Sequence, residues 1–174
     1  MGTGKDRRKR LLAIAAVAAV LGAAGGAGLG RAEPSPCDYK EFGLDAAKFF
    51  VYLTKDSPYR SWRHWPGREA TRPQGPHGPR AVTYVNPAAY EAIVRKDTMA
   101  FGSLIVMENR DPDGSLRSLS VRIKIKGYNP EGGDWYWFAF APDGAAQAEG
   151  RAGVCLGCHG KGKADDYVMG SPAR

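Results

Sequence analysis

The segment Leu119-Ser120-Val121-Arg122-Ile123-Lys124-Ile125-Lys126 alternates apolar and polar residues without a break. Side chains on a β-strand point to opposite faces with a period of two, so the pattern predicts a strand with one face in a core and the other face polar. Such half-buried strands are typical of antiparallel sheets. The segment therefore predicts an antiparallel sheet, and the flanking sequence predicts its neighbours.

Further strands are expected on both sides of this segment. Residues 102–108 are rich in β-branched side chains, and the turn sequence Asp111-Pro112-Asp113-Gly114 joins them to the alternating strand, which indicates a hairpin. Residues 81–85 predict an earlier strand. Residues 134–141 hold five aromatic side chains and offer no polar face. We therefore expect that strand to be central and covered on both sides.

Two helices are predicted before the hairpin. Residues 38–55 carry apolar side chains at helical spacings and end before Pro58. Residues 87–96 follow Asn86, a good N-cap, and begin with proline, which is favoured at the first helical position. The order of elements predicts an α+β fold, an antiparallel β-sheet with an N-terminal helix and a C-terminal helical segment.

The motif Cys155-Leu156-Gly157-Cys158-His159 lies in that C-terminal segment. Two thiols three positions apart can each add to a vinyl group of haem, which places the adjacent imidazole under the iron. We therefore predict one covalently attached haem c per chain, with Cys155 and Cys158 binding the porphyrin and His159 binding the iron.

A thioredoxin-like pair or a zinc-binding pair is the alternative for these cysteines. Redox pairs usually open a helix after a strand, and zinc needs four ligands. The remaining donors, Cys37, His64 and His77, are far apart in the sequence. His64 and His77 fall in an irregular, proline-rich loop, where either supplies an imidazole for a sixth ligand, although exposed loop histidines need no such role.

Residues 1–32 have the features of a secretory signal peptide. Basic residues at positions 5–10 precede an uncharged run at 11–30, and a small residue, Ala32, marks the expected cleavage site. An uncleaved membrane anchor is the alternative, but the run is mostly Ala and Gly. We expect export by the general secretory route to the periplasm, with no stable membrane span after cleavage.

The basic character of the chain resides mainly in this signal. Residues 1–32 hold six of the 25 basic and one of the 18 acidic residues, which leaves 19 and 17. Nucleic-acid binding is therefore not expected. Residues 33–174 are expected to form one folded unit, made of a tail and helix at 33–57 and a haem domain at 58–174. Cys37 is either an incidental thiol or a partner for an intermolecular disulfide.

Together these features resemble the cytochrome P-460 family of exported mono-haem c-type proteins, on the side of cytochrome c′-beta. The resemblance implies a homodimer of antiparallel sheets whose five-coordinate iron is open on its distal side. Apart from the haem motif, the landmarks are short segments in the same order: Tyr59-Arg60-Ser61-Trp62, 82–90, 102–108, Gly133-Asp134-Trp135 and Asp166-Tyr167-Val168.

Two departures from the hydroxylamine-oxidising members of that family concern the site. Those members place a porphyrin-linked lysine directly before a glutamate, where this chain has Met107 before Glu108, and a proton-accepting carboxylate where this chain has Arg122. A thioether cannot form that link, and a guanidinium cannot act as a base. The resemblance then implies a protein that binds nitric oxide or carbon monoxide, for example to scavenge nitric oxide, without being a turnover enzyme.

Several side chains keep two interpretations. Arg122 either donates a hydrogen bond to an iron-bound ligand or is an exposed strand residue. Met107 either packs in the haem pocket or binds iron, which would give a six-coordinate electron-transfer cytochrome with a redox partner protein. Glu108 is a distal acid or base, or is solvated. A shift in alignment would return Lys124 or Lys126 to the haem edge and restore a hydroxylamine or nitric oxide oxidoreductase.

The aromatic residues also have two interpretations each. Trp62 and Trp65 either line a haem edge or anchor the loop against the sheet. Phe101, Phe138 and Phe140 either shield the iron from water or belong to the core.

Overall fold

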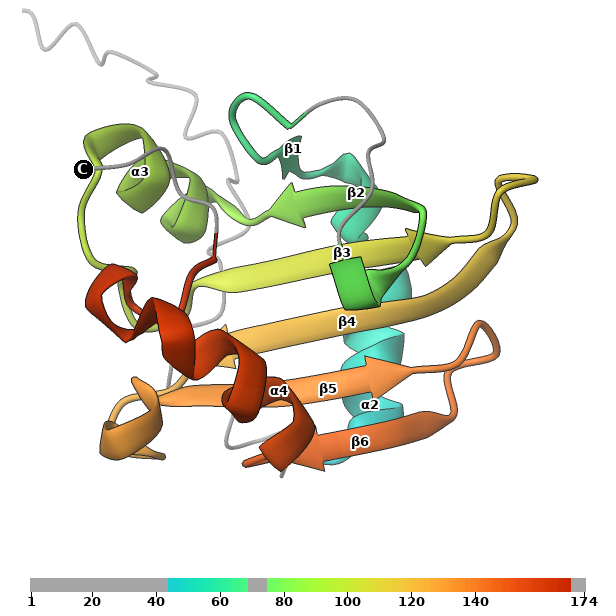
Figure 1. Ribbon diagram of the computed structural model, residues 1–174. Coiled ribbons are helices and arrows are strands. Elements are labelled where there is room, and N and C mark those ends of the chain that lie inside the picture. Colours follow the sequence, from blue (N-terminus) through green and yellow to red (C-terminus); the bar gives the residue numbers. More distant parts are fainter. Residues whose placement is uncertain (1–43, 69–74, 170–174) are drawn as a thin grey trace, which may run out of the picture. The chain divides into compact units, whose positions relative to one another are not determined.

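The antiparallel sheet predicted from the alternating segment is the centre of the computed structural model, and it has six strands. The structure describes residues 44–68 and 75–169, all within the unit 33–174. The predicted signal peptide and Cys37 lie outside the described residues. The strands follow one another in chain order across the sheet (Figure 1): β1 (Arg63–His64), β2 (Arg80–Val85), β3 (Leu104–Arg110), β4 (Leu116–Lys124), β5 (Trp135–Phe140) and β6 (Ala146–Gly150).

One face of the sheet carries the main hydrophobic core. The apolar positions of β4 point into it, as the alternation predicted, and meet apolar residues of β3 and β5. Helix α2 (Ala46–Val51) and the π-helical turn Tyr52–Asp56 lie across this face (Figure 1). Asp45 caps α2 by accepting from the backbone N–H of Lys48 at 2.8 Å. Within the described residues, the helix predicted at 38–55 therefore begins at Ala46.

The opposite face is covered by α3 (Pro87–Arg95), α4 (Gly153–His159) and the 3₁₀ segment Gly160–Asp165 (Figure 1). Asn86 caps α3, as predicted. Its side-chain oxygen accepts from the backbone N–H groups of Ala89 at 3.1 Å and of Leu104 at 3.0 Å. The second bond ties the start of α3 to β3. This face has its own apolar cluster around Trp135 and Trp137.

The aromatic strand β5 serves both clusters. Tyr136, Phe138 and Phe140 point to the α2 side, whereas Trp135 and Trp137 point to the α3 and α4 side. Phe138 and Phe140 therefore belong to the core, and Phe101 is 41% exposed. Pairing with β6 makes β5 an inner strand, as expected. The short strand β1 lies in the segment expected to be an irregular loop and was not predicted, and neither was β6. The sequence of β6, Ala-Gln-Ala-Glu-Gly, lacks β-branched and aromatic residues, so pairing rather than propensity determines it.

The observed elements confirm the α+β prediction. Across residues 44–68 and 75–169, no helix has both the length and the apolar character needed to cross a bilayer.

Glu108 is buried on the α2 face, with 0% of the residue exposed, so the expectation of a solvated carboxylate is wrong. Its carboxylate accepts from the Tyr59 hydroxyl at 2.7 Å, from Arg60 Nε at 2.7 Å and from Arg110 Nε at 3.0 Å. Burial by itself raises the pKa of Glu108, but these hydrogen bonds outweigh it and hold the pKa below its usual value. The carboxylate therefore joins the loop at Tyr59–Ser61 to the sheet.

We expect Glu108→Gln to lower the free energy of unfolding by about 1–3 kcal/mol, because the amide nitrogen cannot accept from the donors around it. Denaturant titration measures this. The matched control is Glu91→Gln, which removes an exposed ion pair with Arg95 and should cost less than about 0.5 kcal/mol.

The difference in unfolding free energy between wild type and Glu108→Gln should depend on pH. Because the folded-state pKa of Glu108 lies below the unfolded one, its stabilisation is present above about pH 4.3 and is lost as the pH falls through the folded-state pKa. The gap between wild type and Glu108→Gln should therefore narrow in acid. An equal cost for both variants, or a gap independent of pH, would contradict this account.

Candidate functional site

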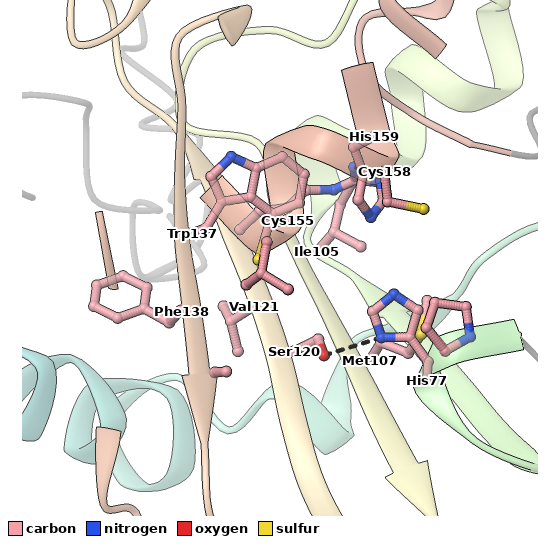
Figure 2. A pocket seen from close by; sticks show the side chains of 14 residues that line it. His77, Ile105, Met107, Ser120, Val121, Trp137, Phe138, Cys155, Cys158 and His159 are labelled. Atoms are coloured by element: carbon pink, nitrogen blue, oxygen red, sulfur yellow. Dashed lines mark hydrogen bonds between the residues drawn. The ribbon is translucent and has the colours of Figure 1, made fainter. Parts of the chain in front are cut away.

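A pocket lies between α4 and the sheet face opposite α2. Its floor comes from Ile105, Met107, Ser120, Arg122 and Trp137 (Figure 2). Strand register brings these together, since Ile105 and Trp137 flank Arg122, and Met107 pairs with Ser120. Two cavities, of about 230 and 370 Å³, share several of these lining side chains and are treated together as the pocket.

Cys155 and Cys158 line the pocket from α4, and neither is in a disulfide. Three positions apart on a helix, they lie on the same face. Burial raises the pKa of the Cys155 thiol, with Arg122 opposing the shift, whereas a redox-active pair at a helix start normally has a lowered thiol pKa. Their neighbour Val154 also lines the pocket and is 80% exposed. Cys155 therefore presents a neutral thiol to the pocket, and the Cys158 thiol lies on the same helix face.

His159 also faces the pocket, and its orientation is determined by the backbone. Its Nδ1 lies 2.9 Å from the carbonyl oxygen of Tyr167, which can only accept, so Nδ1 carries the proton and donates. Burial, with the nearby charge of Arg122, lowers the pKa of His159 to about 4. The imidazole is therefore neutral at physiological pH, and its Nε2 has a free lone pair, the state required of a metal ligand.

Arg122 lies beside this hydrogen bond. Its Nη1 donates to the Tyr167 carbonyl at 2.8 Å and lies 3.3 Å from His159 Nδ1, and its guanidinium packs over the rings of Trp135 and Trp137. Burial lowers its pKa to about 10, which leaves it charged at neutral pH. The expectation of an exposed Arg122 is wrong, since it is 7% exposed. Its guanidinium supports the His159 side of the pocket.

The turn at Asp166 and Tyr167 provides the shared carbonyl. Both residues have positive φ, 58° and 61°, which is rare for a residue as bulky as tyrosine. Several contacts hold the turn: Asp166 pairs with Lys124 and accepts from the N–H of Met99 at 3.0 Å, and its carbonyl accepts from Trp135 Nε1 at 2.9 Å. From the sequence this segment was only a landmark of the family resemblance, because no local pattern shows that the Tyr167 carbonyl accepts a hydrogen bond from His159.

The other candidate residues are divided between the two faces of the sheet. Met107 lines both cavities, whereas Glu108, its neighbour, points to the α2 side and does not join the site. Lys124 is buried against Asp166, and Lys126 is exposed. None of the described residues lining the cavities is a lysine or a carboxylate.

Of the histidines and tryptophans in the loop after α2, some line the pocket and others do not. His77 lines both cavities, and its ring centre is 6.2 Å from that of His159, so the expectation of an exposed loop histidine is wrong for His77. His64 instead contacts the ring of Tyr84 at 4.8 Å. Trp65 is buried and lines the larger cavity, while Trp62 packs against the α2 core.

The residues present fit a covalently bound haem better than a bare metal ion. In the part of the chain that the structure describes, no three His, Cys, Asp or Glu side chains are grouped so that they could hold a metal ion. The pocket brings the thiols of Cys155 and Cys158 and the neutral imidazole of His159 together with apolar walls. Trp137 Nε1, buried at its edge, has no hydrogen-bond partner within the described ranges. An acceptor-bearing group bound there would satisfy it.

Comparison with known proteins supports a haem cofactor. A family model described as cytochrome P460 matches residues 57–169, which include every residue of the pocket named above. No curated protein matches the chain.

The Lys124–Asp166 pair provides a test of how the turn is held. Asp166→Asn keeps an acceptor for Met99 and a residue type that tolerates positive φ, but leaves the Lys124 ammonium buried without its counter-charge. We expect a loss of about 3–5 kcal/mol in the free energy of unfolding.

The double variant Lys124→Met/Asp166→Asn is the matched control. It removes both charges and should be more stable than Asp166→Asn alone, as measured by denaturant titration. A double variant no more stable than the single one would show that the ion pair does not hold the turn.

Proposed function

Because the chain belongs to the cytochrome P460 family of haem-binding cytochromes, we propose that it is an exported mono-haem c-type cytochrome that binds small diatomic ligands such as nitric oxide and carbon monoxide. Cys155 and Cys158 hold the haem through thioether bonds, and His159 Nε2 is the axial ligand. Scavenging of nitric oxide is the activity that fits a protein of this kind.

The geometry of His159 supports the attachment. The Tyr167 carbonyl holds Nδ1–H, so Nε2 is directed away from that bond and into the pocket that both thiols line. In metal-binding histidines such a partner fixes the tautomer and raises ligand basicity. The haem supplies the iron, and these residues bind and orient it.

The composition of the pocket supports a small diatomic molecule as the ligand. Beyond His159 the cavity extends past Ile105, Met107 and Ser120, mostly apolar surface suited to a neutral diatomic molecule. Hydroxylamine oxidation in this family uses a porphyrin-linked lysine and a nearby carboxylate. The absence of both from the described lining residues supports gas binding over that alternative.

Electron transfer is the second candidate function. Met107 and His77 both line the pocket, and either is a side chain that binds haem iron. A six-coordinate iron of that kind would exchange electrons with a redox partner protein. The proposed periplasmic location rests on the N-terminal signal, and the proposed homodimer rests on the family resemblance.

Covalent attachment is tested by the mass of the denatured protein after export in a strain that matures c-type cytochromes. We expect the mass of one haem to remain with wild type and to be lost in the double variant Cys155→Ser/Cys158→Ser. The third cysteine gives the control, since Cys37→Ser should retain the haem. A haem that dissociates from the denatured wild-type chain would contradict the proposal.

Gas binding is tested on the haem-loaded protein by absorption spectroscopy. We expect carbon monoxide to shift the spectrum of the reduced protein, and nitric oxide to do so as well. Phe50→Leu, on the α2 side of the sheet, is a control that should leave both shifts unchanged. A spectrum indifferent to both gases would favour electron transfer, and a further link between chain and haem would restore the oxidoreductase alternative.

A further inference from the structure

His77 is held over the pocket by β4. The Arg117 guanidinium donates to the His77 carbonyl at 3.0 Å, and the Ser120 hydroxyl lies 3.2 Å from His77 Nδ1. The next residue, Gly78, has φ of +109°, and a Cβ there would come within 2.5 Å of Arg117 Nη2. A φ of this size favours glycine, whereas the end of the Arg117 side chain could move away from a Cβ. Both the backbone and the ring of His77 are thus positioned by the sheet.

The hydrogen bonds around Ser120 leave Nε2 of His77 available. Asn109 Nδ2 donates to Ser120 Oγ at 2.9 Å, and that oxygen has a second lone pair for a proton on His77 Nδ1. In the tautomer with the proton on Nδ1, Nε2 carries the lone pair. In that tautomer His77 resembles His159, with an Nδ1 partner and a free Nε2.

The two imidazoles face each other across the pocket (Figure 2), with ring centres 6.2 Å apart. Two imidazoles bound on opposite sides of one metal ion have centres about 6 Å apart, since each metal–nitrogen bond is about 2 Å and the ring nitrogen lies about 1 Å from the ring centre. The observed separation leaves room for one iron atom between the rings. A histidine that only donates a hydrogen bond to an iron-bound gas would stand farther away.

We infer that His77 is the sixth ligand of the haem iron when no gas is bound, and that a diatomic ligand must displace it. The inference rests on the proposed haem attachment and deepens it, because it replaces an open distal side with one occupied by an exchangeable imidazole. Ser120 is a positioning residue that orients His77. Met107, beside His77 in the same pocket, is the competing candidate for that coordination position (Figure 2).

The test uses the haem-loaded protein, with absorption and electron paramagnetic resonance spectra and the rate of carbon monoxide binding. We expect wild type to be low-spin and His77→Leu to be high-spin, with carbon monoxide binding to the reduced variant at least about tenfold faster. His64→Leu, which changes the other loop histidine, and Met107→Leu should both remain low-spin.

A second pair of measurements separates ligation from a structural role. Adding imidazole to His77→Gly should restore the low-spin spectrum, which a defect in folding would not allow. Ser120→Ala should keep the low-spin spectrum but bind carbon monoxide faster than wild type, because His77 loses the partner of its Nδ1.

A high-spin wild type, or a low-spin His77→Leu, overturns the inference while the haem mass still supports attachment. Conversion of Met107→Leu to high spin assigns the coordination position to Met107 and also overturns it. If the wild-type chain carries no covalent haem, the proposed function fails, and the inference fails with it.

Discussion

The carbonyl oxygen of Tyr167 is the atom on which the site depends. It accepts from His159 Nδ1 and from Arg122 Nη1, and so connects the C-terminal motif to the centre of the sheet. A carbonyl can only accept, so its position decides which nitrogen of His159 is left free. The positive φ of Asp166 and Tyr167 is costly for non-glycine residues, and it persists because Lys124, Met99 and Trp135 all bind the turn.

The sheet divides stability and chemistry between its faces. Because side chains alternate along β3, Glu108 enters the ion-pair network under α2 while Met107 enters the pocket. The same alternation on β4 sends Val121 to the core and Arg122 to His159. A substitution on the α2 face should therefore change stability while leaving the pocket composition intact.

The features that local sequence patterns encode could be predicted. The period of two predicted β4 and its two faces, β-branched or aromatic runs predicted its neighbours, and Asn86 predicted the start of α3. The spacing of Cys155 and Cys158 indicated the haem motif. What could not be predicted depends on contacts between distant segments. Strand β6 exists through its pairing with β5. Glu108 is buried because Tyr59 and Arg60, from a distant segment of the chain, join Arg110 of its own strand around the carboxylate.

His77 shows the same limit at the site itself. In the sequence it is one histidine in a proline-rich loop, and only the partners on β4, Arg117 and Ser120, separate it from His64.

The two imidazoles of the pocket differ in how firmly they are held. His159 lies at the end of α4, directly after Cys158, and its ring is held by the Tyr167 turn, which many contacts fix. His77 lies on a three-residue 3₁₀ segment, and its ring is held by a 3.2 Å contact with one hydroxyl, that of Ser120 on β4. Exchange should therefore occur at His77 and not at His159. A protein built only for electron transfer gains nothing from such asymmetry, since both ligands must stay in place during the redox cycle. A protein that keeps its iron bound and still admits a small ligand requires one firmly held ligand and one exchangeable ligand. The unequal support of the two rings therefore favours gas binding.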